Sequence, residues 1–294
     1  MSLDRTLIGT STPVVEVEWT DDDVQLYALA VGAGQDPLKE LELTTENSGT
    51  SRLRALPTHA LVLAQRSTRL WGPFGDYEPS AAVHARQTLT LARPWPSRGR
   101  ASIRSTVVDM FVTPSTGVVV TESVATDEAG ETLFQAQRWV MVRGAGEAGA
   151  QRPRADDWDP PGTVPDRVVT LRTRPEQALL YRLCGDRNRL HSDPVYARMA
   201  GFEVPILHGL CTLGFAARAL CAHDQPAGGA QLLSIDARFR SPVTPGYELE
   251  LLEWTDGPER WFEVRTSDGR PAIDHGRARV EPARGARDDK GATA

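Results

Sequence analysis

The sequence predicts an α+β protein made of two similar halves, each an antiparallel β-sheet wrapped around a helix. Runs of alternating apolar and polar residues, typical of half-buried strands, fill the later part of both halves. In each half, helical segments precede these runs. A stretch rich in Gly, Pro and Asp between Gly144 and Asp166 separates the halves, and a chain of 294 residues is long enough for two domains.

The first half is expected to form a strand, a helix and then four strands. The alternating segment 15–19 predicts the first strand, Thr20 can cap the following helix, and Gly32 can end it. The segment 36–69 has no clear period. Strand patterns then occupy 83–91, 101–112, 118–125 and 132–142, with turns at 114–117 and 127–130.

The second half repeats this order. A strand at 168–171 precedes helices at 175–183, 194–200 and 206–221, and four strands follow, at 233–240, 247–251, 261–265 and 272–280. In the first of these four, Leu233, Ile235, Ala237 and Phe239 form the apolar face. The helix 206–221 is apolar on nearly every side, with Arg218 as its one charge, so it must be enclosed. A sheet curled around such a helix, twice over, is a tandem (double) hot-dog fold.

Domain boundaries follow from these segments. We expect an N-terminal domain over 1–145, a linker over 146–166, a C-terminal domain over 167–283 and a disordered tail over 284–294. The second domain is expected to carry the chemistry described below.

Composition excludes several classes of protein. The chain has 33 basic and 39 acidic residues and a net charge of −6, which argues against a nucleic-acid partner. No apolar run reaches the 18 or so residues of a membrane span, so no membrane partner is expected. Three cysteines without paired spacing and the lack of a signal-peptide pattern favour a cytoplasmic protein.

Chemically capable residues concentrate between Gly185 and Pro194. Asp186 and His191 can both reach one water molecule, so that one removes its proton and the other returns a proton to a substrate, while Asn188 can orient either. The alternative is structural: Asp186 caps a turn, Asn188 adopts a left-handed conformation, Asp193 caps the next helix and His191 lies on the surface.

The motif Gly185-Asp186-x-Asn188-x-x-His191, followed by Pro205-Ile206-Leu207-His208-Gly209, resembles the MaoC-like, type 2 enoyl-CoA hydratase family. Tyr27-Ala28-Leu29 and Leu56-Pro57-Thr58 are similar to the non-catalytic first half of its fused members, which implies that the first domain accommodates the acyl part of the substrate. The resemblance implies a lyase of lipid or steroid metabolism that reversibly hydrates trans-2-enoyl-CoA to (3R)-3-hydroxyacyl-CoA. It implies no metal and no cofactor, since CoA is part of the substrate.

The resemblance also assigns roles residue by residue. Asp186 and His191 correspond to the acid/base pair, Asn188 to a positioning residue, and Gly209 to the glycine whose N–H binds the thioester oxygen. Such a role suits a glycine at the start of a buried helix, where backbone N–H groups are unpaired. The expected substrate contacts are His84, Ala85, Arg187, Arg189, Leu190, Phe239 and Arg240.

Two positions depart from the family pattern. Arg189 stands where the motif usually has Pro; pointing inward it would approach Asp186, and pointing outward it is a surface residue. Pro114 stands where members often offer a Lys to CoA. The arginines at 182, 187, 189 and 198, with Arg238 and Arg240, form a basic region that can attract the phosphates of CoA.

Other functions remain open. The enzymatic alternative is a dehydratase of carrier-protein-bound 3-hydroxyacyl groups, and the non-enzymatic one is a catalytically impaired acyl-CoA-binding subunit. A metal site from Asp186, His191, Asp193 and His208 fits no standard spacing, and a Cys184 nucleophile would give a thioesterase. The acyl group, the direction of the reaction, and monomer or homodimer are not determined.

Overall fold

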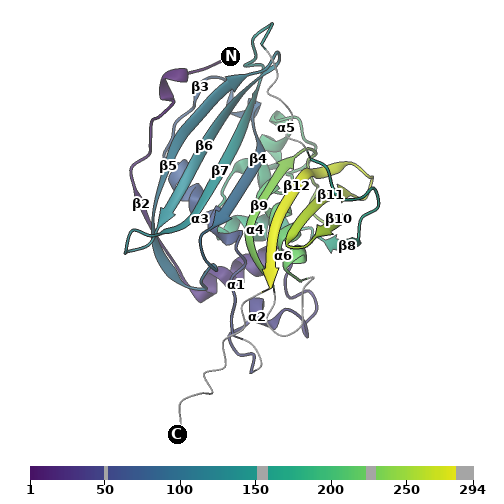
Figure 1. Ribbon diagram of the computed structural model, residues 1–294. Helices are drawn as coiled ribbons and strands as arrows, with labels where there is room; N and C mark the ends of the chain where they lie inside the picture. Colours follow the sequence, from purple (N-terminus) through teal and green to yellow (C-terminus); the bar gives the residue numbers. More distant parts are fainter. Residues whose placement is uncertain (50–51, 151–157, 223–229, 283–294) are drawn as a thin grey trace.

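One ten-stranded antiparallel sheet organises the molecule (Figure 1). The computed structural model describes residues 1–49, 52–150, 158–222 and 230–282. The strands follow the order β2-β5-β6-β7-β4-β9-β12-β11-β10-β8, so each half supplies five adjacent strands. A separate two-stranded sheet joins β1 (Ser2–Leu3) to β3 (Gly75–Asp76).

The strands predicted for the first half are confirmed. They are β2 (Val15–Trp19), β4 (Ala82–Leu91), β5 (Gly99–Val112), β6 (Thr116–Thr126) and β7 (Thr132–Arg143). Helix α1 (Asp21–Ala30) begins as predicted, because the Thr20 side chain accepts the Asp23 N–H and Asp23 returns a bond to the Thr20 N–H. Two helices were not predicted, the short α2 (Leu41–Thr44) and the ten-residue α3 (His59–Thr68).

The second half also follows the prediction, with two corrections. Its elements are β8 (Arg167–Arg172), α4 (Gln177–Tyr181), α5 (Pro194–Met199), α6 (Gly209–Ala222), β9 (Ala230–Phe239), β10 (Glu248–Asp256), β11 (Glu259–Thr266) and β12 (Pro271–Pro282). Helix α6 begins at Gly209 and not at Ile206, because the Leu207 N–H donates to the Val243 carbonyl, 2.7 Å away. A register shift between β9 and β12 buries Leu232 in place of Leu233.

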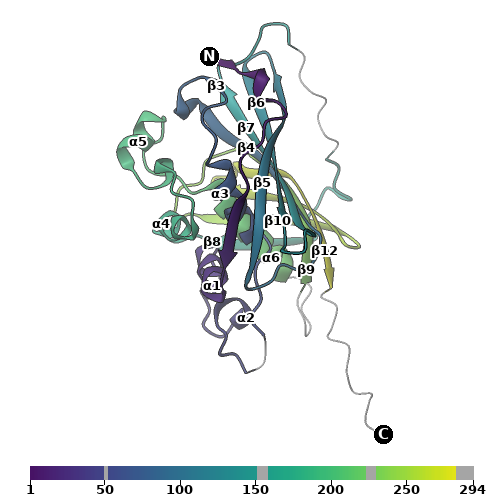
Figure 2. The same cartoon turned by 90° about the vertical axis from the view of Figure 1, so that its left-hand side faces the viewer.

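The two halves are joined edge to edge by β4 and β9. This pair is antiparallel, with Leu89 opposite Ile235. Each half contributes the strand that follows its long helix, so the order of elements is mirrored about this seam. Figure 2 shows α1, α3, α4 and α5 on one side of the sheet. The predicted double hot-dog arrangement is confirmed.

Helix α6 is enclosed as predicted. Eleven of its residues are buried. Gly214 allows the close approach of α1, since a Cβ there would lie 2.4 Å from a methyl carbon of Val31. The charge of Arg218 is neutralised by Glu40, 2.6 Å away, so this otherwise apolar helix carries no unpaired ion into the core.

The domain boundaries stay a proposal. The first half ends its last strand at Arg143, and the second begins its first at Arg167. Part of the predicted linker and the predicted tail, 284–294, lie outside the described residues. Within the described residues, no helix is long and apolar enough to cross a membrane.

Candidate active site

The Gly185–His191 motif forms a tight loop before α5. Gly185 has a φ of 143°, a value that L side chains rarely adopt. The Asn188 N–H donates to Asp186 Oδ1 (3.2 Å), and Asn188 Oδ1 accepts the Leu190 N–H (3.1 Å), which starts a short 3₁₀ turn, Arg189–His191. The motif thus bends back on itself, and the side chains of Asp186 and His191 come from its two ends.

Two imidazole rings connect the loop to the start of α6. His191 Nδ1 lies 2.8 Å from the Ile206 carbonyl oxygen, so Nδ1 carries the proton and Nε2 is left as the acceptor. The His208 ring stacks on His191, with centroids 3.7 Å apart, and its Nε2 lies 3.3 Å from the Asp186 carbonyl oxygen. His208 therefore links the backbone of Asp186 to the ring of His191.

The environment keeps both predicted catalytic side chains in their basic forms. Burial alone would raise the pKa of the Asp186 carboxyl, but His208, the Asn188 N–H and His191 outweigh it and hold that pKa below its usual 3.8. Burial lowers the pKa of His191 below 6.5, although the Ile206 carbonyl opposes this. At neutral pH the pair is a carboxylate next to a neutral imidazole.

The start of α6 offers unpaired backbone donors next to this pair. The Cys211 and Thr212 N–H groups bond to the His208 carbonyl, whereas those of Gly209 and Leu210 have no acceptor among the described residues. The Phe239 ring lies over Gly209, where a Cβ would come within 3.1 Å of it. The site therefore has N–H donors at the positive end of a helix dipole, as an anionic oxygen requires.

Helix α3 of the first half and the residue after it contact the Gly185–His191 loop. Gln65 Nε2 donates to Asp186 Oδ2 at 3.1 Å. Arg69, one turn later, donates to the Gly185 carbonyl and lies 3.8 Å from Asp186 Oδ1. Sequence reasoning missed both residues. A segment buried nearly all round lacks the amphipathic period that reveals surface helices, and contacts between halves leave no signal in spacing.

The predicted substrate contacts divide into two groups. His84 and Phe239 meet across the seam of the sheet, with ring centroids 4.8 Å apart, and burial lowers the pKa of His84 to about 3. Ala85 follows His84 at a register shift in β4. By contrast, Arg187 is exposed, and Leu190 is half-buried.

Two predicted arginine contacts are engaged with carboxylates elsewhere. Arg189 points away from Asp186, since it pairs with Asp193 at 2.6 Å and lies over the Tyr196 ring at 5.2 Å. Arg240 pairs with Asp274 at 3.0 Å. These pairs reduce the net positive charge of the basic region expected from the sequence.

The structural alternative for the motif is correct in part. Asp186 does accept a turn N–H, and Asp193 does cap α5, accepting the Val195 and Tyr196 N–H groups. However, Asn188 has a φ of −58°, which is not left-handed, and His191 is 9% exposed and thus not a surface residue. Turn formation and the burial of His191 together position the pair.

The thiol and metal alternatives find little support in the geometry. Burial raises the pKa of Cys184 to about 12, which keeps the thiol protonated. In the described part of the chain, no three His, Cys, Asp or Glu side chains gather in a group able to hold a metal ion.

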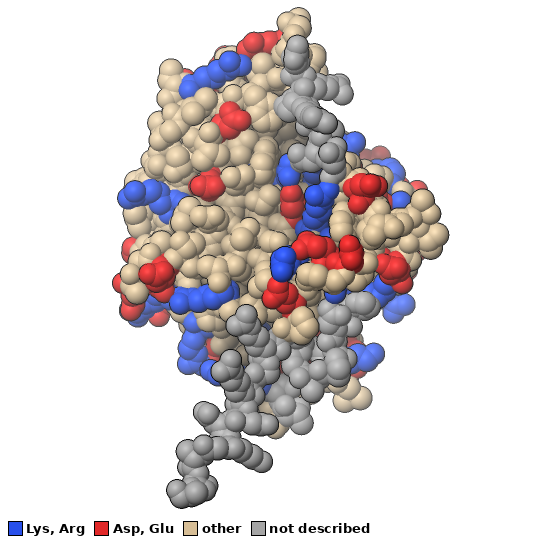
Figure 3. Space-filling model, in the orientation of Figure 1, with Lys and Arg blue, Asp and Glu red and all other residues tan. Residues whose placement is uncertain are grey.

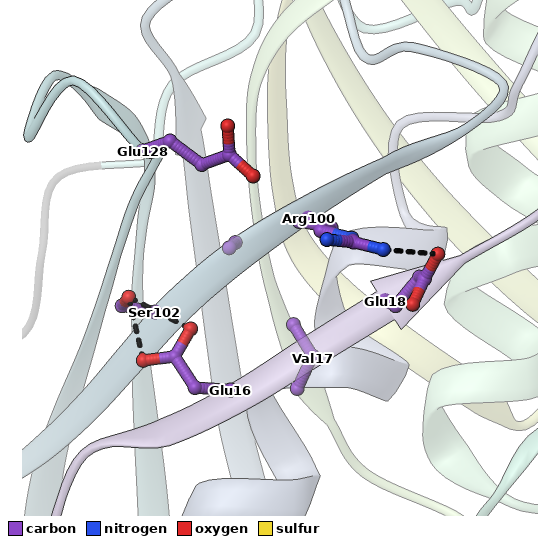
Figure 4. A pocket seen from close by; sticks show the side chains of 7 residues that line it. Glu16, Val17, Glu18, Arg100, Ser102 and Glu128 are labelled. Atoms are coloured by element: carbon purple, nitrogen blue, oxygen red, sulfur yellow. Dashed lines mark hydrogen bonds and ion pairs between the residues drawn. The ribbon is translucent and has the colours of Figure 1, made fainter.

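Other hollows lie away from this site. A cavity of about 1240 Å³ opens near Arg218 and Cys221, at the opposite end of α6 from Gly209. Figure 4 shows a smaller one on β2 and β5, where Glu18 faces Arg100 and Glu16 faces Ser102. Figure 3 shows positive and negative side chains mixed where the halves meet. Arg86 of β4 and Asp236 of β9 form an ion pair across this seam, 2.5 Å apart. None of these places includes the predicted acid/base pair.

The fold and this site define a double hot-dog hydratase or dehydratase, and the comparisons with known proteins agree. A MaoC like domain matches residues 157–274, and an MFE-2 hydratase 2 N-terminal domain matches residues 17–144. The chain belongs to the MaoC-like dehydratase and hydratase 2 family and is a lyase of the hydratase/dehydratase type.

Relatives span nearly the whole chain. It is 39% identical to 3-hydroxyacyl-thioester dehydratase Y of Mycobacterium tuberculosis, covering 92% of this chain and 95% of that protein. It is 37% identical to the enoyl-CoA hydratase ChsH3 of the same organism, covering 85% and 88%. Among solved structures, a MaoC-like dehydratase from Phytophthora capsici superposes with a TM-score of 0.82 at 25% identity, covering 96% and 98%.

Proposed function

We propose that this enzyme reversibly hydrates trans-2-enoyl-CoA to (3R)-3-hydroxyacyl-CoA, with Asp186 and His191 as its acid/base pair. The observation that carries the proposal is that His208 connects the two residues. It bonds to the Asp186 backbone, and its ring stacks on that of His191. Relatives named enoyl-CoA hydratase and 3-hydroxyacyl-thioester dehydratase support a thioester substrate.

The pair supplies the proton transfers of the reaction. In hydration, one of the two bases removes a proton from water while the water oxygen bonds to C3. The electron pair of the C2–C3 double bond moves toward C2 and the thioester carbonyl, and the same proton is then delivered to C2. One water molecule is consumed, the pair regains its starting state, and dehydration is the reverse.

The start of α6 stabilises the enolate that forms on the thioester oxygen. The N–H groups of Gly209 and Leu210 are free to donate there. Asn188 uses its side-chain oxygen in the loop, but its side-chain NH₂ has no partner among the described residues and is available to hold water or substrate. His84 and Phe239, which meet at Gly209, are proposed to contact the acyl thioester.

Purified protein is expected to hydrate trans-2-enoyl-CoA. The measurement is loss of absorbance of the conjugated thioester across a panel of fatty, branched and steroid acyl groups. The product should be oxidised by a 3R-specific and not by a 3S-specific hydroxyacyl-CoA dehydrogenase. No turnover of any member, in either direction, would instead identify an acyl-CoA-binding subunit.

A dehydratase of carrier-bound acyl groups is the second candidate. It is favoured by the name of one relative, which specifies a thioester without specifying CoA. The two are separated by offering the same 3-hydroxyacyl group on CoA and on an acyl carrier protein. A kcat/KM at least tenfold higher on the carrier protein would support the second candidate.

Gln65 is proposed as a positioning residue for Asp186. Gln65→Glu would place a second carboxylate at the position where an amide now donates to Asp186 Oδ2. The added negative charge disfavours the Asp186 carboxylate and favours the protonated His191 imidazole, so the pKa of both groups should rise. We expect the acidic limb of kcat to move to higher pH by about one unit or more, with activity recovering as pH increases.

Gln65→Ala tests the same role without adding charge. It removes a hydrogen bond to an ionised group, so kcat should fall about tenfold with little change in KM. Arg66→Ala is the matched control, since Arg66 is exposed on the same helix. If Gln65→Glu kept the wild-type pH profile, Gln65 would have no role in holding Asp186.

A further inference from the structure

Arg138 of β7 faces the interior of the first half. Its neighbour Trp139 lies under the Arg86 guanidinium, at 4.8 Å, on the outer face of the sheet. Successive side chains of a strand point to opposite faces. Ala136 and Val140, two positions before and after Arg138, are both 4% exposed and line the inner face. The Arg138 side chain therefore projects from the sheet toward the helices.

Among the described residues, no carboxylate pairs with the Arg138 guanidinium. Its Nε is sealed from solvent without a hydrogen-bond partner, and none of the ion pairs among the described residues includes it. Burying a cation without an anionic partner is costly, and proteins normally avoid it. An inward-facing, half-buried arginine whose Nε is sealed, and which has no hydrogen-bond or ion-pair partner among the described residues, can therefore serve as a binding group for an anion.

Arg138 lies near the proposed site, because Val140, two positions along β7, is the cross-strand partner of His84. Burial lowers its pKa, Asp186 and Tyr77 oppose that effect, and Arg69 adds to it. Arg138 in turn contributes to the lowered pKa of His84. Yet no carboxylate oxygen of Asp186 is within ion-pair distance, 4.0 Å, of Arg138. The guanidinium thus lies within electrostatic range of Asp186 without being paired with it.

We propose that Arg138 binds a carboxylate on the acyl chain of the substrate, so that this enzyme acts on trans-2-enoyl thioesters whose acyl chain ends in an anionic group. The inference rests on the proposed hydratase function. A guanidinium matches a carboxylate with two parallel hydrogen bonds, and enclosure strengthens that contact. The phosphates of CoA are a less suitable partner, because they are bulky and strongly hydrated, whereas Arg138 is on the inner face of the sheet.

The test compares two substrates that differ in one charge. They are trans-2-hexenedioyl-CoA, esterified at the enoyl end and free at the other, and trans-2-hexenoyl-CoA. For the wild type, kcat/KM should be at least tenfold higher for the carboxylated substrate. Arg138→Met should lower that ratio at least tenfold, while Arg138→Lys, which keeps the charge but loses the fork, should lower it less. Arg104→Met, an exposed arginine on β5, should leave the ratio unchanged.

Three results would overturn the inference. One is a wild-type preference for the uncharged acyl chain. Another is an equal loss on both substrates in Arg138→Met, which would indicate a purely structural or electrostatic role. The third is a loss on CoA thioesters but not on the matching N-acetylcysteamine thioesters, which would assign Arg138 to the CoA phosphates. If no thioester is turned over, the proposed hydratase function fails. The preference for the carboxylated acyl chain is then measured as the ratio of the dissociation constants of the two thioesters.

Discussion

Asp186→Asn is expected to lower kcat for enoyl-CoA hydration by roughly 10²- to 10⁴-fold, the usual contribution of a general acid or base. Asparagine has nearly the same shape and can still accept the Asn188 N–H at the Oδ1 position, where the distance is now 3.2 Å. What it lacks is the ability to take and return a proton. The measurement is kcat and KM, from initial rates over a range of enoyl-CoA concentrations that reaches saturation.

The expected pattern separates chemistry from binding. KM and the dissociation constant for the 3-hydroxyacyl-CoA should change little, because Gly209 and the contacts of the acyl chain remain. The melting temperature should fall only slightly, since the Asn188 N–H keeps its acceptor and only the bond from Gln65 to the Oδ2 position and the charge facing Arg69 are lost. Full activity in this variant would remove Asp186 from the mechanism.

Much of the fold could be predicted because its signals are local. The strands of both halves alternate every second residue, so β2 and β4 to β7 appear where the pattern places them. The start of α1 is set by the capping box, in which Thr20 and Asp23 bond to each other across only four residues of sequence. Features that depend on a few adjacent residues can be read from one chain.

The missed helix α3 and the shifted start of α6 have non-local causes. Six consecutive residues from His59 to Ala64 are buried, so the first six residues of α3 present no polar face from which a helical period could be recognised. The start of α6 moved to Gly209 because Leu207 bonds to Val243, more than thirty residues away. Local sequence carries neither kind of information.

The candidate site shows the same division. The motif identified Asp186, Asn188 and His191 together, because a single loop holds them. It included His208 without assigning its contact with His191, and it gave no sign of Gln65 from the first half. In the structure the His208 ring stacks on that of His191, and Gln65 donates to Asp186. The half without a catalytic motif therefore contributes side chains to the site, which no motif search within one half would reveal.

His191→Gln is expected to lower kcat by at least roughly 10²-fold, because glutamine can hydrogen-bond but cannot exchange a proton at neutral pH. In the wild type, burial holds the pKa of His191 below 6.5, so its basic form persists as the pH falls. The midpoint of the acidic limb of kcat/KM should therefore lie below 6.5. In His191→Gln this limb should disappear or move to the lower pH at which Asp186 becomes protonated.

Acid unfolding must be separated from this titration. Burial lowers the pKa of His59 to about 4 and of His208 to about 3. Below about pH 6.5 these two histidines are therefore protonated in the unfolded chain but remain neutral in the folded one. The free energy of unfolding consequently decreases as the pH falls from about 6.5 toward those values. Activity lost only by titration returns at once when enzyme held at low pH is diluted into neutral buffer. If activity is recovered in this way and the midpoint of the acidic limb of kcat/KM lies above pH 6.5, then His191 is charged in the free enzyme and is not its resting base.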